Sequence, residues 1–124
     1  MSMNTPISKV RGLGSARSGT EHWWMQKIAA VALVPLTIWF VASIVQMTHA
    51  DYFMVRTWLA SPVSATLILL YIVIGLYHLR LGLQAVVEDY IHGGGMKVFL
   101  QFAILFGCTI IAVTSIFSVL KIAL

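Results

Sequence analysis

Charged side chains are scarce in this chain, which has eight Lys or Arg and four Asp or Glu among 124 residues. A soluble domain covers its surface with about 25% charged residues, and the 10% present here cannot do that. A hydrophobic share of 60% and a mean hydropathy of +0.92 point the same way. The composition therefore excludes a water-soluble globular domain and predicts a single-domain membrane protein.

Cysteine is nearly absent, because Cys108 is the only one. One thiol allows neither an internal disulfide nor a cysteine cluster for an iron-sulfur centre, and the sequence has no dinucleotide-binding glycine motif. The basic residues give a net charge of +4 but are scattered singly, which excludes a nucleic-acid partner. Any chemistry must therefore occur in the membrane, at its edge or with other subunits.

Three stretches carry no charge: residues 28–50, 57–79 and 98–120. At 23 residues each, they would rise about 34 Å as helices and cross a hydrocarbon core of about 30 Å. We predict an all-α integral membrane protein (domain 1–124) with an N-terminal tail at 1–26 and transmembrane helices at about 27–47, 62–90 and 98–120. Ser61 and Pro62 start the second helix, and Pro35 predicts a kink in the first.

The positions of the basic residues predict the orientation of the chain. More of them flank one predicted side of the membrane (Lys9, Arg11, Arg17, Lys27 and Lys97) than the other (Arg56 and Lys121). Positively charged segments stay inside, so we expect the N-terminus in the cytoplasm, membrane lipid around the helices and a bacterial cell inner membrane. The first 20 residues contain Ser and Arg and no acid, so a transit peptide and the mitochondrial inner membrane are the second interpretation.

His78 lies inside the second predicted span, where an ionisable group is costly unless it is paired, binds a ligand or meets water. It could form an interhelical hydrogen bond, or it could be an axial ligand of a haem iron. Gly82 and Ala85 follow at i+4 and i+7, and Asp89, at i+11, falls within about 20° of the same helix face. That face therefore presents a candidate iron ligand (His78), a recess at the small residues Gly82 and Ala85, and an acidic side chain (Asp89).

Residues 78–93 read HLRLGLQAVVEDYIHG. This run resembles a signature of the small hydrophobic membrane anchor of succinate dehydrogenase (respiratory complex II): His-x-x-x-Gly, then Asp-Tyr after six intervening residues, and then Val/Ile-His-Gly. His22-Trp23-x-x-x-Lys27 resembles that family's His-Trp-x-x-x-Arg segment, with Lys in place of Arg. The resemblance covers about residues 15–95 and the three-helix plan. The Ser-Pro-His motif of the sister anchor, the other membrane subunit of that enzyme, is absent.

The resemblance implies that His78 is an axial ligand of the iron of haem b, which lies between the two anchors. His22 and His49 stand at the ends of the first helix and His92 is about 21 Å beyond His78 along the second. The second ligand is therefore expected from the sister anchor, which would complete the helix bundle.

The resemblance also assigns the polar residues near the predicted inner surface. Tyr90 would donate a hydrogen bond to a carbonyl oxygen of ubiquinone, and Asp89 would support that site. His22 and Lys27 would lie near the haem propionates. Without the resemblance, Tyr90 would be interpreted as an interfacial aromatic residue and Asp89 as a solvated helix end.

The implied function is to anchor the iron-sulfur and flavoprotein subunits at the cytoplasmic face and to help pass electrons from succinate to ubiquinone, as a subunit that is not catalytic by itself. Two alternatives remain open. One is a small transporter in which His78, Arg80 and Asp89 form a proton relay. The other is a haem-free structural anchor, with His78 bonding a neighbouring helix. Arg80 is otherwise interpreted as a side chain that snorkels to the headgroups.

Overall fold

The computed structural model describes residues 5–12 and 18–124, and all its regular elements are helices. They are α1 (Pro6–Val10), α2 (Ser18–Gln46), α3 (Tyr52–Ala60), α4 (Pro62–Tyr90) and α5 (Gly94–Ala123). Three of them contain segments long and apolar enough to cross a membrane: Thr20–Gln46, Pro62–Tyr90 and Gly94–Ala123. The predicted all-α membrane fold with three spanning helices is confirmed.

The ends of two long helices differ from the predicted spans. Helix α4 has the predicted bounds, whereas α2 begins at Ser18 instead of near residue 27, and α5 covers Gly94–Ala123 instead of 98–120. The prediction placed these helix ends at charged residues, which mark the membrane edge but do not interrupt a helix. Residues 1–4 and 13–17 of the predicted tail, including Arg17, lie outside the described residues.

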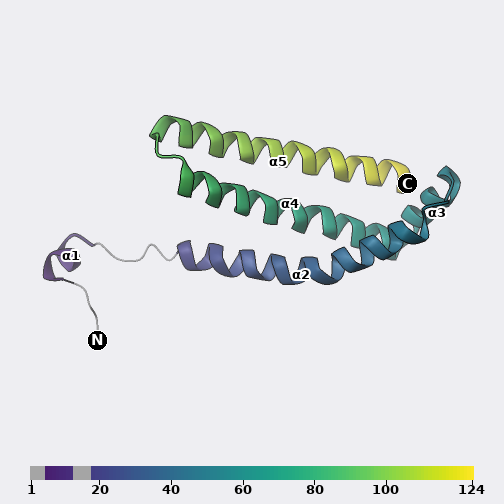
Figure 1. Cartoon of the computed structure of the whole chain (residues 1–124), viewed down its shortest axis with the longest axis horizontal. Coiled ribbons are helices and arrows are strands. Elements are labelled where there is room, and N and C mark those ends of the chain that lie inside the picture. The colour runs from purple at the N-terminus through teal and green to yellow at the C-terminus, as the bar shows by residue number, and fades with distance from the viewer. Residues whose placement is uncertain (1–4, 13–17) are drawn as a thin grey trace.

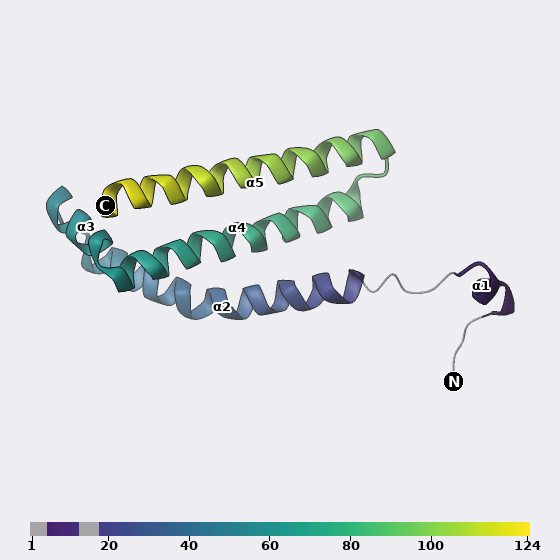
Figure 2. The same ribbon diagram turned by 180° about the vertical axis from the view of Figure 1, so that it is seen from behind.

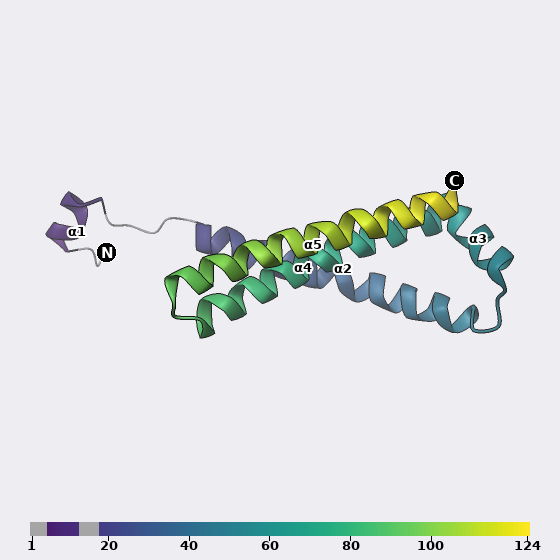
Figure 3. The ribbon, with the colours of Figure 1, turned by 90° about the horizontal axis from the view of Figure 1, so that it is seen from above.

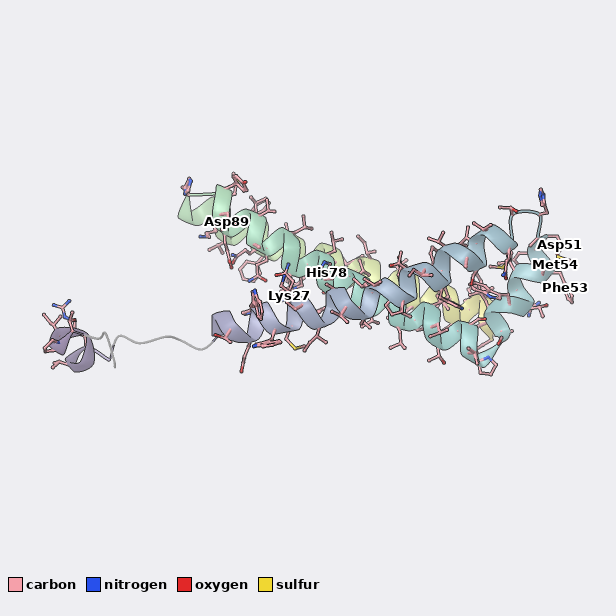
Figure 4. The ribbon with its side chains drawn as sticks, turned by 60° about the horizontal axis from the view of Figure 1, so that its bottom comes forward. Lys27, Asp51, Phe53, Met54, His78 and Asp89 are labelled. Atoms are coloured by element: carbon pink, nitrogen blue, oxygen red, sulfur yellow. The ribbon has the colours of Figure 1, made fainter. Side chains whose placement is uncertain are left out.

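Helix α3 was not predicted. It begins after Asp51, whose side chain accepts a hydrogen bond from the backbone N–H of Met54 at 2.9 Å, as an N-cap residue does. It ends at Ser61, because the residue before a proline is disfavoured in a helix. Figure 4 shows Asp51 and Met54 at the opposite end of the molecule from Asp89.

Helix α4 is the centre of the arrangement. It packs against α2 and against α5, while α3 contacts both α4 and α5; within the described residues, α2 and α5 do not contact each other. Figure 1 shows α2 and α5 on opposite sides of α4, and Figure 2 shows the same order from behind. Seen from above, α2 diverges from the α4–α5 pair toward α3 (Figure 3). The long helices therefore form an open row and not a closed bundle.

The described residues enclose very little. The buried residues are Ala29, Leu59, Ser64, Ile68, Leu81, Val87 and Cys108, and none of the large side chains is fully buried. Most large apolar side chains on α2 and α5 are exposed. In a membrane such surfaces face lipid or the helices of another chain, so the packing of this chain is completed from outside.

One polar contact joins α2 to α4. The Thr37 hydroxyl donates a hydrogen bond to the Tyr71 hydroxyl at 3.1 Å, and the Tyr71 ring stacks on Phe40 with ring centroids 5.1 Å apart. Helix α2 continues through Pro35, and its ribbon bends past its midpoint (Figure 1). Such a bend is expected at a proline, which removes one helical hydrogen bond.

The Thr37–Tyr71 hydrogen bond can be measured by a double-mutant cycle with Thr37→Val and Tyr71→Phe. We expect a coupling of about 0.6 kcal/mol in the free energy of unfolding, the usual value between transmembrane helices, measured by denaturing-detergent titration. Thr57→Val combined with Tyr71→Phe is the control, because the Thr57 hydroxyl bonds its own helix at Phe53 O. A coupling no larger than in the control would contradict the expected contribution.

Candidate functional site

The beginning of α2, the end of α4 and the beginning of α5 lie at the same end of the molecule (Figure 1). Three of the five predicted site residues, His22, Asp89 and Tyr90, lie toward this end, and Lys27 and His78 lie deeper in α2 and α4. Figure 4 shows Lys27 and His78 at a similar level along α2 and α4, with Asp89 farther toward the end of α4. The antiparallel contact of α2 with α4 thus brings the two predicted motifs to the same half of the molecule.

His78 is half-buried, and its Nδ1 atom is enclosed without a hydrogen-bond partner among the described residues. The interhelical hydrogen bond that was the alternative interpretation is therefore not made by this nitrogen within the described chain. A buried polar atom without a partner costs about 1–3 kcal/mol. The imidazole is held in the span without being committed to the packing of its own chain.

An open recess follows His78 on α4. A Cβ built on Gly82 would meet no atom within 4 Å. One built on Gly75, which is three residues before His78, would contact Leu33 Cδ2 at 3.9 Å. Because α4 is one unbroken helix, Gly82 and Asp89 keep the face that their spacing predicts. The recess beside His78 is open toward whatever lies outside this chain.

A cavity of about 410 Å³ lies between α2 and α4, one turn and more beyond His78 toward the helix end. Its lining residues are His22, Trp23, Gln26, Leu81, Gln84, Ala85 and Glu88. Gln84 Nε2 donates a hydrogen bond to Glu88 Oε1 at 3.3 Å. The cavity is therefore polar on both of its walls, with a histidine on one helix and a carboxylate on the other.

The sequence motif placed His22 in this region, whereas Gln26, Gln84 and Glu88 were missed. The available signal was their spacing, since His22 and Gln26, like Gln84 and Glu88, are four residues apart and share a helix face. Lys27 does not line the cavity.

Lys27 instead lies beside an aromatic residue of its own helix. Its Nζ is 5.6 Å from the centroid of the Trp23 ring, which is within the range of a cation–π contact. Trp23 itself lines the cavity. Lys27 therefore places a positive charge beside one of the residues that line the cavity, without lining it itself.

Tyr90 and Asp89 project from the end of α4. Tyr90 is the last residue of the helix and is 75% exposed, and Asp89 is exposed as well. Neither is among the residues that line the cavity between α2 and α4 or the cavity between α4 and α5. A closed site at these two side chains thus requires another chain.

The described residues contain no group of three His, Cys, Asp or Glu side chains that could hold a metal ion. A metal at His78 would therefore need ligands from a cofactor or another subunit. The fold and these positions define a multi-pass membrane subunit. The described part of its own chain does not enclose the predicted site residues in a complete site.

Comparison with known proteins identifies the class more closely. The sequence model of the family described as succinate dehydrogenase/fumarate reductase transmembrane subunit matches residues 1–117. The succinate dehydrogenase hydrophobic membrane anchor subunit of Paracoccus denitrificans is 32% identical over 108 residues, which cover 87% of this chain and 84% of that protein. The corresponding subunit of Rickettsia bellii is 35% identical over 85 residues, 68% of each chain.

The succinate dehydrogenase membrane anchor subunit of Reclinomonas americana is 27% identical over 85 residues, covering 66% of this chain and 71% of that protein. The chain belongs to the family of succinate dehydrogenase/fumarate reductase transmembrane subunits. The predicted identification as a succinate dehydrogenase membrane anchor is confirmed. Such an anchor associates with the other subunits of its complex.

Proposed function

We propose that this anchor binds haem b jointly with the sister anchor, and that His78 is one of the two axial ligands of the haem iron. The observation that carries the proposal is that the half-buried His78 imidazole lies within a span and makes no hydrogen bond through its enclosed Nδ1 atom in the described chain. The ring is therefore not committed to helix packing through Nδ1, and the iron would bind the other ring nitrogen. Neutral imidazole is the usual nitrogen ligand of haem iron. When bound, haem b supplies a one-electron redox centre within the membrane.

The recess at Gly82 supports this assignment, because a flat macrocycle needs open space beside its ligand. The other histidines, His22, His49 and His92, stand near or beyond the ends of α2 and α4. None of them is at the depth of His78, so the second ligand is assigned to the sister anchor.

His22 and Lys27 are proposed to serve the haem propionates. His22 lines the polar cavity between α2 and α4, and Lys27 adds a positive charge next to it. A cation facing a propionate forms a charge-assisted pair. Lysine offers a point charge and not the bidentate geometry of the family's arginine.

Tyr90 and Asp89 are proposed to complete a ubiquinone site at the end of α4. Reduction of ubiquinone to ubiquinol takes two electrons and two protons. The Tyr90 hydroxyl donates a hydrogen bond to a quinone carbonyl oxygen, which stabilises the charge that develops there. Asp89 is an exposed carboxylate next to it and keeps that region open to water, from which the protons come.

The electrons come from succinate through the flavoprotein and iron-sulfur subunits, which we propose dock on the cytoplasmic face. The basic residues before and near the start of α2, together with Lys97 in the first turn of α5, favour this end of the molecule as the inner one. The membrane is then the inner membrane of a bacterial cell.

The transporter alternative is not favoured by the arrangement of α4. Arg80 lines a cavity between α4 and α5, about 160° around the helix from His78. A relay through His78, Arg80 and Asp89 would have to pass from one side of α4 to the other.

Replacement of His78 tests the ligand assignment. We expect His78→Ala to lower the haem content of the purified complex or to change its reduced-minus-oxidised spectrum. Succinate oxidation by an artificial acceptor should stay near the wild-type rate. His49→Ala is the control, because this exposed residue lies at the other end of α2. An unchanged haem content and spectrum in His78→Ala would overturn the assignment.

Filling the recess gives a second test. Gly82→Leu should reduce haem content because its side chain occupies the open space beside His78. Gly107→Leu on α5 is the matched control, since a Cβ there also meets nothing within 4 Å and the cost of adding leucine to a helix is the same. Equal haem content in the two variants would show that the Gly82 recess does not hold the macrocycle.

The quinone site is tested by Tyr90→Phe. Loss of one hydrogen bond to the reacting oxygen should lower quinone reduction about tenfold, equivalent to about 1.4 kcal/mol, with succinate oxidation by artificial acceptors nearly intact. The control is Tyr52→Phe, a tyrosine of similar exposure at 71%, located at the other end of the molecule. Unchanged quinone reduction in Tyr90→Phe would mean that Tyr90 does not contact the quinone.

A further inference from the structure

A second polar cavity, of about 190 Å³, lies between α4 and α5. Its polar residues are Arg80 and Gln84 from α4 and Gln101 from α5, and its apolar wall includes Phe102 and Leu105. Of these residues, Gln84 alone also lines the cavity between α2 and α4. The α4–α5 cavity is therefore a separate feature on the other side of the central helix.

The guanidinium of Arg80 has no carboxylate partner in this chain. All four acidic residues, Glu21, Asp51, Glu88 and Asp89, belong to the described part, and none of them lines the cavity. Glu88 accepts its hydrogen bond from Gln84, Asp89 stands about 180° around α4 from Arg80, and Glu21 and Asp51 lie on or beside α2 and α3.

Arg80 also lies deep enough in the predicted span for the absence of a carboxylate partner to be energetically costly. It lies ten residues, or about 15 Å, before the end of α4, and its side chain is half-buried. Helix α4 has 29 residues and is about 44 Å long, against a hydrocarbon core of about 30 Å. Arg80 is thus near the edge of the core, where an unpaired cation is unfavourable and an anion from the headgroup layer is within reach.

The residues that line the cavity suit a charged headgroup with an attached hydrocarbon chain. Arginine binds phosphate with two parallel hydrogen bonds, and the amides of Gln84 and Gln101 provide further polar groups beside it. Lys97, half-buried and one turn before Gln101 on α5, adds a second positive charge. The apolar side chains of Phe102 and Leu105 continue the same groove.

We propose that the α4–α5 cavity is a binding site for an anionic glycerophospholipid, with Arg80 as the residue that contacts the phosphate. Basic pockets between transmembrane helices are known to bind lipid headgroups of this kind. The anion is not a haem propionate, because His78 lies about 160° away around α4. The site is independent of the haem and quinone assignments.

The test measures lipid bound to the whole purified complex. Complexes carrying Arg80→Gln, Gln101→Leu or the control Arg56→Gln are exchanged into detergent with equal amounts of phosphatidylglycerol and phosphatidylcholine, and bound lipid is counted by native mass spectrometry. Arg56 is an exposed cation at the opposite end of the chain. We expect Arg80→Gln to weaken phosphatidylglycerol binding about tenfold, as for loss of a charge-assisted hydrogen bond, with Arg56→Gln unchanged.

Gln101→Leu keeps the charge and should weaken phosphatidylglycerol binding by a smaller factor, which covers the case that Arg80→Gln fails to assemble. Equal binding of phosphatidylglycerol by wild type, Arg80→Gln and Gln101→Leu would overturn the proposal. Equal preference of the wild type for phosphatidylcholine, or displacement of the lipid by inorganic phosphate alone at millimolar concentration, would overturn the requirement for an anionic lipid.

Discussion

A polar side chain inside a bilayer needs a partner, because the hydrocarbon offers none. In this chain the constraint falls on α4, which is the helix that contacts both α2 and α5. Its C-terminal half carries His78 on one side and Arg80 on the other. Within the described chain the enclosed His78 Nδ1 has no hydrogen-bond partner, and no carboxylate lines the cavity at Arg80. The partners that we propose for the two sides of α4 are a haem at His78 and an anionic lipid at Arg80.

The open arrangement of the helices also leaves contacts to be made by molecules outside this chain. With few buried residues, the chain relies on local contacts such as the Tyr71 hydroxyl and ring to hold α2 against α4. Other subunits are needed to complete the packing of such an anchor. This agrees with its membership of the family of succinate dehydrogenase/fumarate reductase transmembrane subunits. The exposed apolar faces are then surfaces for lipid and for another helical chain.

The fold was largely predictable because the helix start and stop signals are short local sequence patterns. Ser61 and Pro62 start α4, and the helix ends at Tyr90, before the extended residue Ile91, so its predicted bounds agree with the structure. Charges mark a membrane boundary and not a helix boundary, which is why α2 was predicted too short. Helix α3 was missed because it depends on one capping side chain, Asp51, within the segment between two predicted spans.

The site was predictable only along each helix. Spacing placed Gly82 on the face of His78, and the open space at Gly82 agrees with that. Which residues of α2 face which residues of α4 depends on how the two helices are rotated against each other, and spacing within one helix does not contain that information. That His22 of α2 and Glu88 of α4 line the same cavity could therefore be seen only in the three-dimensional structure.

The most direct test of the central claim is a reduced-minus-oxidised optical spectrum of the wild-type complex, solubilised in detergent, together with identification of its co-purifying chains. The account predicts the signal of a six-coordinate haem b in a preparation that contains the sister anchor, the iron-sulfur subunit and the flavoprotein. An intact complex that oxidises succinate but shows no haem absorbance would contradict the account.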